Sequence, residues 1–156
     1  KPPMTGGAVV ARARLWLGTP YVHQASCRGA GCDCLGLIRG IWRELGGDEP
    51  KALPPYTMDW SEPQGQERLW QGARRHLHPK PLHQASRGDV LLFRMRAGSV
   101  AKHLGIQSWL GSGPEGGGAL PRFIHAYAGR GVVECALSTP WRRRIVARFA
   151  FPQEGV

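Results

Sequence analysis

Long apolar runs and a dense set of cysteines are both missing from this sequence. No window offers the roughly 18 apolar residues that a membrane-spanning helix needs, so we expect no membrane insertion. The N-terminal segment, KPPMTGGAVVARARLW, also lacks the long apolar stretch of a secretory signal. Four cysteines in 156 residues are too few for a scaffold built on disulfides. The fold must therefore be stabilised by a hydrophobic core.

Acidic residues are scarce as well, since 11 Asp and Glu stand against 21 Lys and Arg, for a formal net charge of +10. A basic surface favours polyanions such as nucleic acid, anionic lipid or an acidic cell-wall polymer. No zinc finger, RNP-type segment or basic zipper is recognisable, so we expect no nucleic-acid partner. The densest basic run, Arg142 to Arg144, is either a solvated strand edge or a contact with an acidic polymer.

The length and composition are those of a small globular protein. Hydrophobic residues make up 42% of the chain, which argues against extensive disorder. We expect one domain over residues 1–156, because the chain is too short for two comfortable cores. The 22 glycines and 13 prolines predict many turns, with a proline-rich loop at 48–62 and a flexible hairpin tip at 111–120.

Helix and strand signals occupy different halves of the chain. Helical periodicity predicts three helices, over 8–17, 34–46 and 63–77. After Gly88 the pattern changes to short β-rich runs, and the candidate strands are VLLFRM, VAKHLGIQSW, RFIHAY, VVECAL and RRIVARFAF. Helices first and strands afterwards predict an α+β fold with a mainly antiparallel sheet.

Cys34 stands where a reactive thiol is often found. It follows Asp33, a good N-cap residue, and begins the helix predicted over 34–46. The positive end of a helix dipole favours thiolate over thiol, whereas the neighbouring carboxylate of Asp33 opposes it. Cys34 also begins the apolar stripe of its helix, so we expect it to point toward the sheet.

Two histidines on candidate strands could serve such a thiol. His103 lies in AKHLGIQSW and His125 in RFIHAY, and the two side chains lie side by side if these strands form a hairpin. One ring could then orient the other, as the third member of a triad does. From the spacing alone, a small core cysteine and surface histidines remain the commoner explanation.

The other cysteines have simpler interpretations. The spacing of Cys27, Cys32 and Cys34 does not match a zinc site, so we expect no metal. Cys27 and Cys32 could form a disulfide in an oxidising compartment or remain free loop thiols. Cys135 alternates with apolar residues in a candidate strand and is predicted to be a core residue.

Five short segments occur in a characteristic order along the chain: GTPY at 18–21, DCLGLI at 33–38, GDVLLF at 88–93, KHLGI at 102–106 and FIHA at 123–126. As a set they resemble the motifs of the NlpC/P60 family of cell-wall endopeptidases. A phage and gene-transfer-agent branch of cell-wall peptidases is similar in further segments, namely CDCLGL, AKHLGI, FIHAY and GRGVVE with the following W-R-R-R.

The resemblance implies a papain-like core, in which a cysteine helix packs on a small antiparallel sheet. It implies that Cys34 is the nucleophile, His103 the base and His125 the orienting residue, with Tyr21 and Asp33 near the substrate and the oxyanion. No cofactor is expected. The implied reaction is hydrolysis of an amide in the peptidoglycan stem peptide, by resemblance the γ-D-glutamyl–diaminopimelate bond.

The resemblance also implies a place of action. The protein would be carried on the tail tip of a phage-like particle, next to other tail-tip or baseplate proteins. It would assemble in the bacterial cytoplasm and act in the periplasm or cell wall. Two alternatives stay open: a catalytically weak or inactive structural tail-tip protein on the same fold, and another amidase or transacylase.

Overall fold

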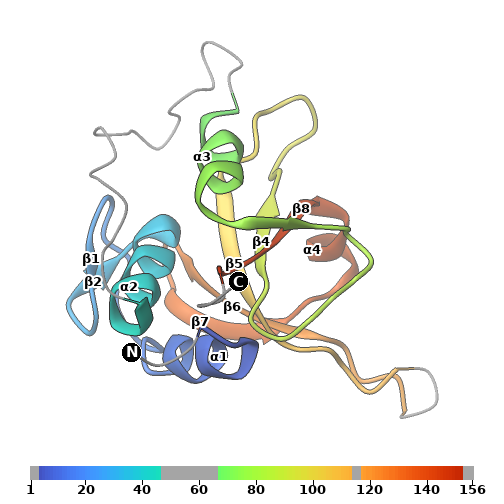
Figure 1. Ribbon diagram of the computed structural model, residues 1–156, viewed down its shortest axis with the longest axis horizontal. Coiled ribbons are helices and arrows are strands. Elements are labelled where there is room, and N and C mark those ends of the chain that lie inside the picture. Colours follow the sequence, from blue (N-terminus) through green and yellow to red (C-terminus); the bar gives the residue numbers. More distant parts are fainter. Residues whose placement is uncertain (1–3, 47–66, 114–116, 153–156) are drawn as a thin grey trace.

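The computed structural model describes residues 4–46, 67–113 and 117–152 (Figure 1). In chain order, the helices are α1 (Gly6–Arg14), α2 (Cys34–Gly46), α3 (Arg68–His76) and α4 (Thr139–Arg144). The strands are β1 (Ser26–Cys27), β2 (Gly31–Cys32), β3 (His78–Lys80), β4 (Val90–Phe93), β5 (His103–Trp109), β6 (Arg122–Tyr127), β7 (Gly131–Ala136) and β8 (Ile145–Ala150). None of the helices described is both long and apolar enough to cross a membrane.

The main sheet has six strands in the order β3-β8-β4-β5-β6-β7, and each neighbouring pair is antiparallel. A second sheet consists of β1 and β2 alone. All five strands expected from the sequence are present, and the hairpin between β5 and β6 has formed. The expected α+β class with a mainly antiparallel sheet is therefore confirmed.

Helix α2 begins and ends as the sequence predicts, at Cys34 and Gly46. Its N-cap is Asp33, whose Oδ1 accepts a hydrogen bond of 2.7 Å from the Gly36 backbone N–H. Leu37 and Ile41, four positions apart on one face, are fully buried against α1, β5 and β6. The face next to α1 needs a glycine, because a Cβ at Gly40 would collide with the ring of Trp16.

The sheet has an apolar layer on each face. Ile106 and Ile124 belong to the large core that α1 and α2 cover. Phe93 and Phe123 point to the other face, where they form a smaller core with Leu91 and Leu137, closed by Trp141 of α4. Helices α1 and α2 thus lie on one side of the sheet and α4 on the other (Figure 1).

Several element boundaries differ from the sequence prediction, and the helices account for the largest differences. Helix α1 covers 6–14 rather than 8–17, because the Thr5 hydroxyl accepts from the Ala8 N–H and starts the helix earlier. Helix α3 begins at Arg68, and residues 63–66 of the predicted helix lie outside the described residues, as does the loop predicted at 48–62. The last predicted strand, 143–151, begins only at Ile145, because 139–144 form α4 with a proline in its first turn.

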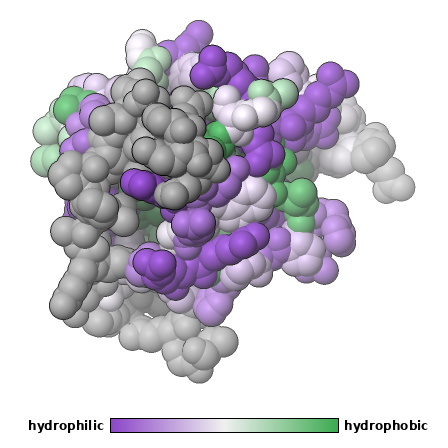
Figure 2. Space-filling model, turned by 90° about the horizontal axis from the view of Figure 1, so that it is seen from above, coloured by the Kyte–Doolittle hydropathy of each residue, from purple (hydrophilic) through white to green (hydrophobic). Residues whose placement is uncertain are grey.

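The face of the molecule seen from the α3 side is mostly hydrophilic where described residues are visible (Figure 2). The last turn of α3 contributes three exposed basic side chains, Arg74, Arg75 and His76. A surface of this kind fits the net charge of +10. It favours contact with an anionic polymer over an apolar partner.

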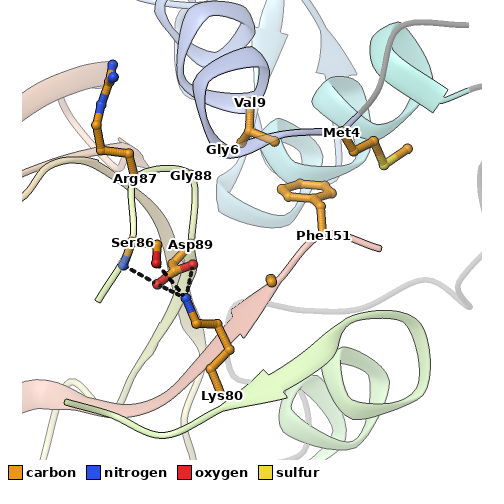
Figure 3. Close-up of a pocket in the computed structure, with 10 residues that line it drawn as sticks. Met4, Gly6, Val9, Lys80, Ser86, Arg87, Gly88, Asp89 and Phe151 are labelled. Carbon is orange, nitrogen blue, oxygen red and sulfur yellow. Dashed lines mark hydrogen bonds and ion pairs between the residues drawn. The ribbon is translucent and has the colours of Figure 1, made fainter. Parts of the chain in front are cut away.

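The turn before β4 is held by a buried network around Asp89. Its carboxylate accepts from Lys80 Nζ at 2.9 Å and from Arg148 Nη1 at 2.9 Å, and it also takes the Ser86 N–H (Figure 3). A cavity of about 160 Å³ lies between this turn, α1 and the end of β8. The Gly88 backbone meets Gly6 so closely there that neither position has room for a side chain. This network locks β4 against β8 and α1.

Candidate active site

The Cys34 thiol lies at the start of α2, against the backbone at the start of β5. Its Sγ–H donates to the carbonyl oxygen of Lys102 over 3.9 Å. Lys102 immediately precedes His103, so the helix start and the first histidine are brought to the same place. Cys34 as a whole residue is half-buried.

His103 and His125 are joined by a hydrogen bond of 2.7 Å between His103 Nε2 and His125 Nδ1. The expected pairing of the two rings across the β5–β6 hairpin is therefore confirmed. Gly105 lies opposite His125 in the register, and a Cβ there would press on Phe123 and on His125. The missing side chain thus makes room for the second histidine.

The two histidines point to the sheet face opposite α2. Along β5, His103 alternates with Leu104, which belongs to the core under α2, and along β6 His125 alternates with Ile124 in the same way. The two histidines therefore do not lie in the helix–sheet interface toward which the apolar stripe of α2 points. Cys34 contacts the carbonyl of Lys102, the residue before His103, at the end of the sheet where β5 begins.

An aromatic cluster encloses the histidine pair. The ring of Trp141 has its centroid 5.9 Å from His103 and 5.0 Å from His125, and Tyr127 lies 5.8 Å from His103. Only 8% of His103 and 1% of His125 are exposed. Trp141 was not predicted as a neighbour of the site, because no helix was expected between the strand predicted over 132–137 and the strand predicted over 143–151.

Burial keeps the thiol and the imidazoles uncharged. Burial, followed by the charge of Asp33, raises the pKa of Cys34 to about 12, although backbone N–H groups, including that of Leu104, act in the opposite direction. Burial and then His125 lower the pKa of His103 to about 3. The position of Cys34 at a helix start does not lower the pKa of its thiol as the sequence suggests, since desolvation outweighs the effect of the helix start.

The resting pair is therefore a neutral thiol beside a neutral imidazole. In a reaction of such a pair, the thiol proton would leave as the new bond forms, as it does in general-base catalysis. His103 Nε2 is occupied by His125, so the ring nitrogen that can accept this proton is Nδ1.

Tyr21 and Asp33 lie beside Cys34. Burial, then the charge of a Cys34 thiolate, raises the pKa of Tyr21 to about 12, and a β-bridge to Cys32 holds Tyr21 in place. Asp33 is 2% exposed and its two carboxylate oxygens take the Gln24 and Gly36 backbone N–H groups. Asp33 thus shapes the loop before the nucleophile.

The remaining cysteines are all free in the structure. Cys27 is exposed, Cys32 is fully buried and Cys135 is half-buried. Cys135 packs on the smaller core, as predicted, but its Sγ also lies 3.4 Å from His125 Nε2. Within the described ranges, no group of three or more His, Cys, Asp or Glu is arranged to hold a metal ion.

Three solved structures share this fold. The NlpC/p60 domain of the peptidoglycan hydrolase SagA is 22% identical, with a TM-score of 0.61, and the match covers 94% of this chain and 99% of that domain. A Staphylococcus aureus protein described as similar to a lipoprotein of the NLP/P60 family is 21% identical, with a TM-score of 0.59 over 93% of this chain. A Bacillus cereus NlpC/P60 family protein is 20% identical, with a TM-score of 0.62 over 94% of this chain.

The chain spans 40% of the length of each of the last two proteins. No protein-family model matches the sequence, and no curated protein is significantly similar to it. The structural similarity shows that the chain has the papain-like NlpC/P60 fold. The expectation of this fold, drawn from the motifs, is confirmed.

Proposed function

We propose that this chain is a cysteine peptidase that hydrolyses an amide bond in the stem peptide of peptidoglycan. The observation that carries the proposal is the joint placement of Cys34 at a helix start beside Lys102 and of His103 in a hydrogen bond with His125. A nucleophile, a base and an orienting group are the parts that acyl transfer needs. The fold shared with the domain of a peptidoglycan hydrolase supports the choice of substrate.

The chemical steps follow from the neutral resting pair. His103 Nδ1 takes the thiol proton while Sγ of Cys34 bonds to the carbonyl carbon, and the carbonyl oxygen becomes an oxyanion near the backbone N–H groups at the start of α2. The carbon–nitrogen bond then breaks, and His103 gives its proton to the leaving amine. Water attacks the thioester, His103 takes a proton from it, and the carboxylic acid and the Cys34 thiol are released.

His125 stabilises this cycle through the second ring nitrogen of His103. When Nδ1 of His103 is protonated, its Nε2–H donates to His125 Nδ1 across the 2.7 Å contact. That hydrogen bond is strongest in the charged state, so it favours the intermediate over the resting pair. The nearby rings of Trp141 and Tyr127 keep water away from it.

We also propose the finer assignments that the motifs suggest. The bond is the γ-D-glutamyl–diaminopimelate bond, and the protein acts from the tail tip of a phage-like particle, where other tail-tip or baseplate proteins hold it. In this proposal the protein is assembled into the particle in the bacterial cytoplasm and acts in the periplasm or cell wall. The net charge of +10 and the mostly hydrophilic face seen in Figure 2 support an anionic polymer as the target.

Mass spectrometry of muropeptides tests both levels of the proposal. Purified peptidoglycan is incubated with the wild type and with Cys34→Ala, and the released fragments identify the bond. Fragments that appear only with the wild type support the peptidase. Equal release by the folded Cys34→Ala variant contradicts the role of Cys34, and cleavage at another bond contradicts only the finer assignment.

The raised pKa of Cys34 favours one second candidate, a catalytically weak structural protein on the same fold. Such a protein binds peptidoglycan without cutting it. Co-sedimentation with insoluble peptidoglycan, combined with no release of fragments by the wild type, would select this candidate.

A further inference from the structure

Cys135 extends the histidine pair by one residue. It lies on β7, two positions from Val133, which pairs with His125 in the register. The Cys135 Sγ is 3.4 Å from His125 Nε2, within the hydrogen-bond range for sulfur, while His125 Nδ1 is 2.7 Å from His103 Nε2. Both ring nitrogens of His125 are therefore engaged, one by His103 and one by Cys135.

This arrangement links the protonation of the three groups. A neutral imidazole carries one N–H and one bare nitrogen, so a ring that donates on one side accepts on the other. If Cys135 Sγ accepts from His125 Nε2–H, then His125 Nδ1 is bare and accepts from His103 Nε2–H. The Nδ1 of His103 is then bare, and it can take the proton of Cys34.

The opposite arrangement disables the base. If the Cys135 S–H donates to His125 Nε2, then His125 Nδ1–H donates to His103 Nε2. The single proton of His103 then sits on Nδ1, which can no longer accept the thiol proton of Cys34. The direction of one S···N hydrogen bond on β7 thus determines whether His103 can act as a base.

We infer that Cys135 is a positioning residue, whose Sγ accepts from His125 Nε2 and thereby holds His103 in the tautomer with a bare Nδ1. The expected effect on kcat rests on the proposed function, whereas the expected tautomers of His103 and His125 do not depend on it. Cys135 acts through His125 and does not touch the substrate.

The chemistry of the two groups favours the accepting direction. Burial, the largest cause, and Glu134 raise the pKa of the Cys135 thiol, while Arg122 and Arg130 act to lower it, so the thiol stays neutral. A thiol S–H is only a weak hydrogen-bond donor, so the ring N–H of His125 is the better donor of the pair. Burial and then Arg130 lower the pKa of His125 to about 4, so His125 stays neutral and keeps one N–H to donate.

Nitrogen-15 NMR of the imidazole rings measures the tautomers directly and needs no substrate. In the wild type at neutral pH, we expect the proton on Nε2 of both His103 and His125. Cys135→Ser retains an acceptor and should retain this pattern. Cys135→Ala removes the acceptor, and we expect both rings to populate a mixture of tautomers. Val133→Ala is the matched control, because it trims a half-buried neighbour on the same face of β7 and should leave the tautomers unchanged.

Kinetics with a muropeptide substrate give the second measurement. We expect Cys135→Ala to lower kcat about tenfold, the worth of one neutral hydrogen bond, with little change in KM. Cys135→Ser should restore most of the loss, and Val133→Ala should cost little. A fall in kcat that Cys135→Ser does not restore, or that Val133→Ala equals, would mean that Cys135 only fills space.

The tautomer measurement decides the inference even if one variant fails to fold or if the wild type cleaves nothing. Protons on Nδ1 of both rings in the wild type overturn it, as does an unchanged tautomer pattern in folded Cys135→Ala. An inactive wild type with the expected tautomers contradicts the proposed function and leaves the positioning by Cys135 supported.

Discussion

Asp33 stabilises the helix that begins at Cys34 and at the same time opposes ionisation of the Cys34 thiol. Its Oδ1 accepts the Gly36 N–H of the first turn at 2.7 Å, and its charge is the second largest cause of the raised pKa of Cys34. One carboxylate therefore caps the helix that carries Cys34 and at the same time favours the protonated form of its thiol.

Asp33→Asn should separate these two effects. The amide oxygen can still accept the Gly36 N–H, while the negative charge is removed, so we expect the pKa of Cys34 to fall and its alkylation by iodoacetamide at pH 8 to become faster. Asp33→Ala is the comparison, because it removes the cap as well and should cost about 1 kcal/mol or more of the free energy of unfolding. An equal alkylation rate of Cys34 in wild type and Asp33→Asn would contradict the electrostatic role.

Cys27 should be alkylated before Cys34 in the wild type at neutral pH. Cys27 is exposed, whereas Cys34 is half-buried and has a pKa raised to about 12. This order reverses the expectation from the sequence, where the helix start alone favours Cys34. Peptide mapping after brief exposure to iodoacetamide gives the order, and modification of Cys34 first would show that the thiol is ionised in solution.

His103 and His125 should differ in what their loss costs. His103→Ala removes the base, and we expect kcat/KM near background. His125→Asn should leave measurable activity, because an asparagine oxygen can still accept from His103 Nε2–H, and His125→Ala should be the more damaging of the two. Both are compared on one defined muropeptide, with circular dichroism to confirm folding. If His103→Ala is the milder change, the two roles are reversed.

Stability should fall as the pH is lowered from about 6.5 toward 4. The pKa values of His103 and His125 are lowered to about 3 and about 4 from an ordinary 6.5, so in this window the unfolded chain binds protons that the folded protein does not. The free energy of unfolding therefore rises with pH between these limits. Urea unfolding at several pH values measures it, and His125→Asn should show a smaller slope. An identical slope would mean that His125 does not stay neutral when folded.

Asp89→Ala should be strongly destabilising. Asp89 is 3% exposed and pairs with Arg148, which is 5% exposed, so its removal leaves a buried charge without its partner. A loss of about 3–5 kcal/mol is expected from such a change. Arg14→Ala, which breaks an exposed pair with Glu134, is the control and should cost about 1 kcal/mol or less. Similar losses from both, measured by urea unfolding, would contradict the importance of burial.

Local patterns predicted the fold better than they predicted the surroundings of the site. The alternation of apolar and polar residues, together with the turn residues, identified the strands. The N-cap at Asp33 identified the first residue of α2. Both signals depend on residues that are near neighbours in the sequence. Trp141 and the contact of Cys135 with His125 were not predictable. They depend on α4, a helix that was not expected from the sequence, and on the diagonal neighbours of β6 and β7.

The electrostatics of the site could not be predicted for a similar reason. Helix position alone suggests an acidic Cys34 thiol, and a lone histidine on a strand suggests an ordinary imidazole. Burial raises the pKa of Cys34 instead of lowering it, and it lowers the pKa of His103. Burial is a property of the assembled sheet, helices and aromatic cluster. The spacing of residues along the chain therefore does not predict how deeply these side chains are buried.

The position of β8 within the sheet affects when, during synthesis of the chain, the site can form. This strand follows every other described element in the chain, yet it lies between β3 and β4. The contact between Cys34 and Lys102 also spans 68 positions of sequence. Contacts of such long range form slowly, and a sheet cannot close around a strand that the ribosome has not yet made. Nascent chains should therefore lack the assembled site until β8 has been synthesised and inserted, so that folding itself sets the time at which the site forms.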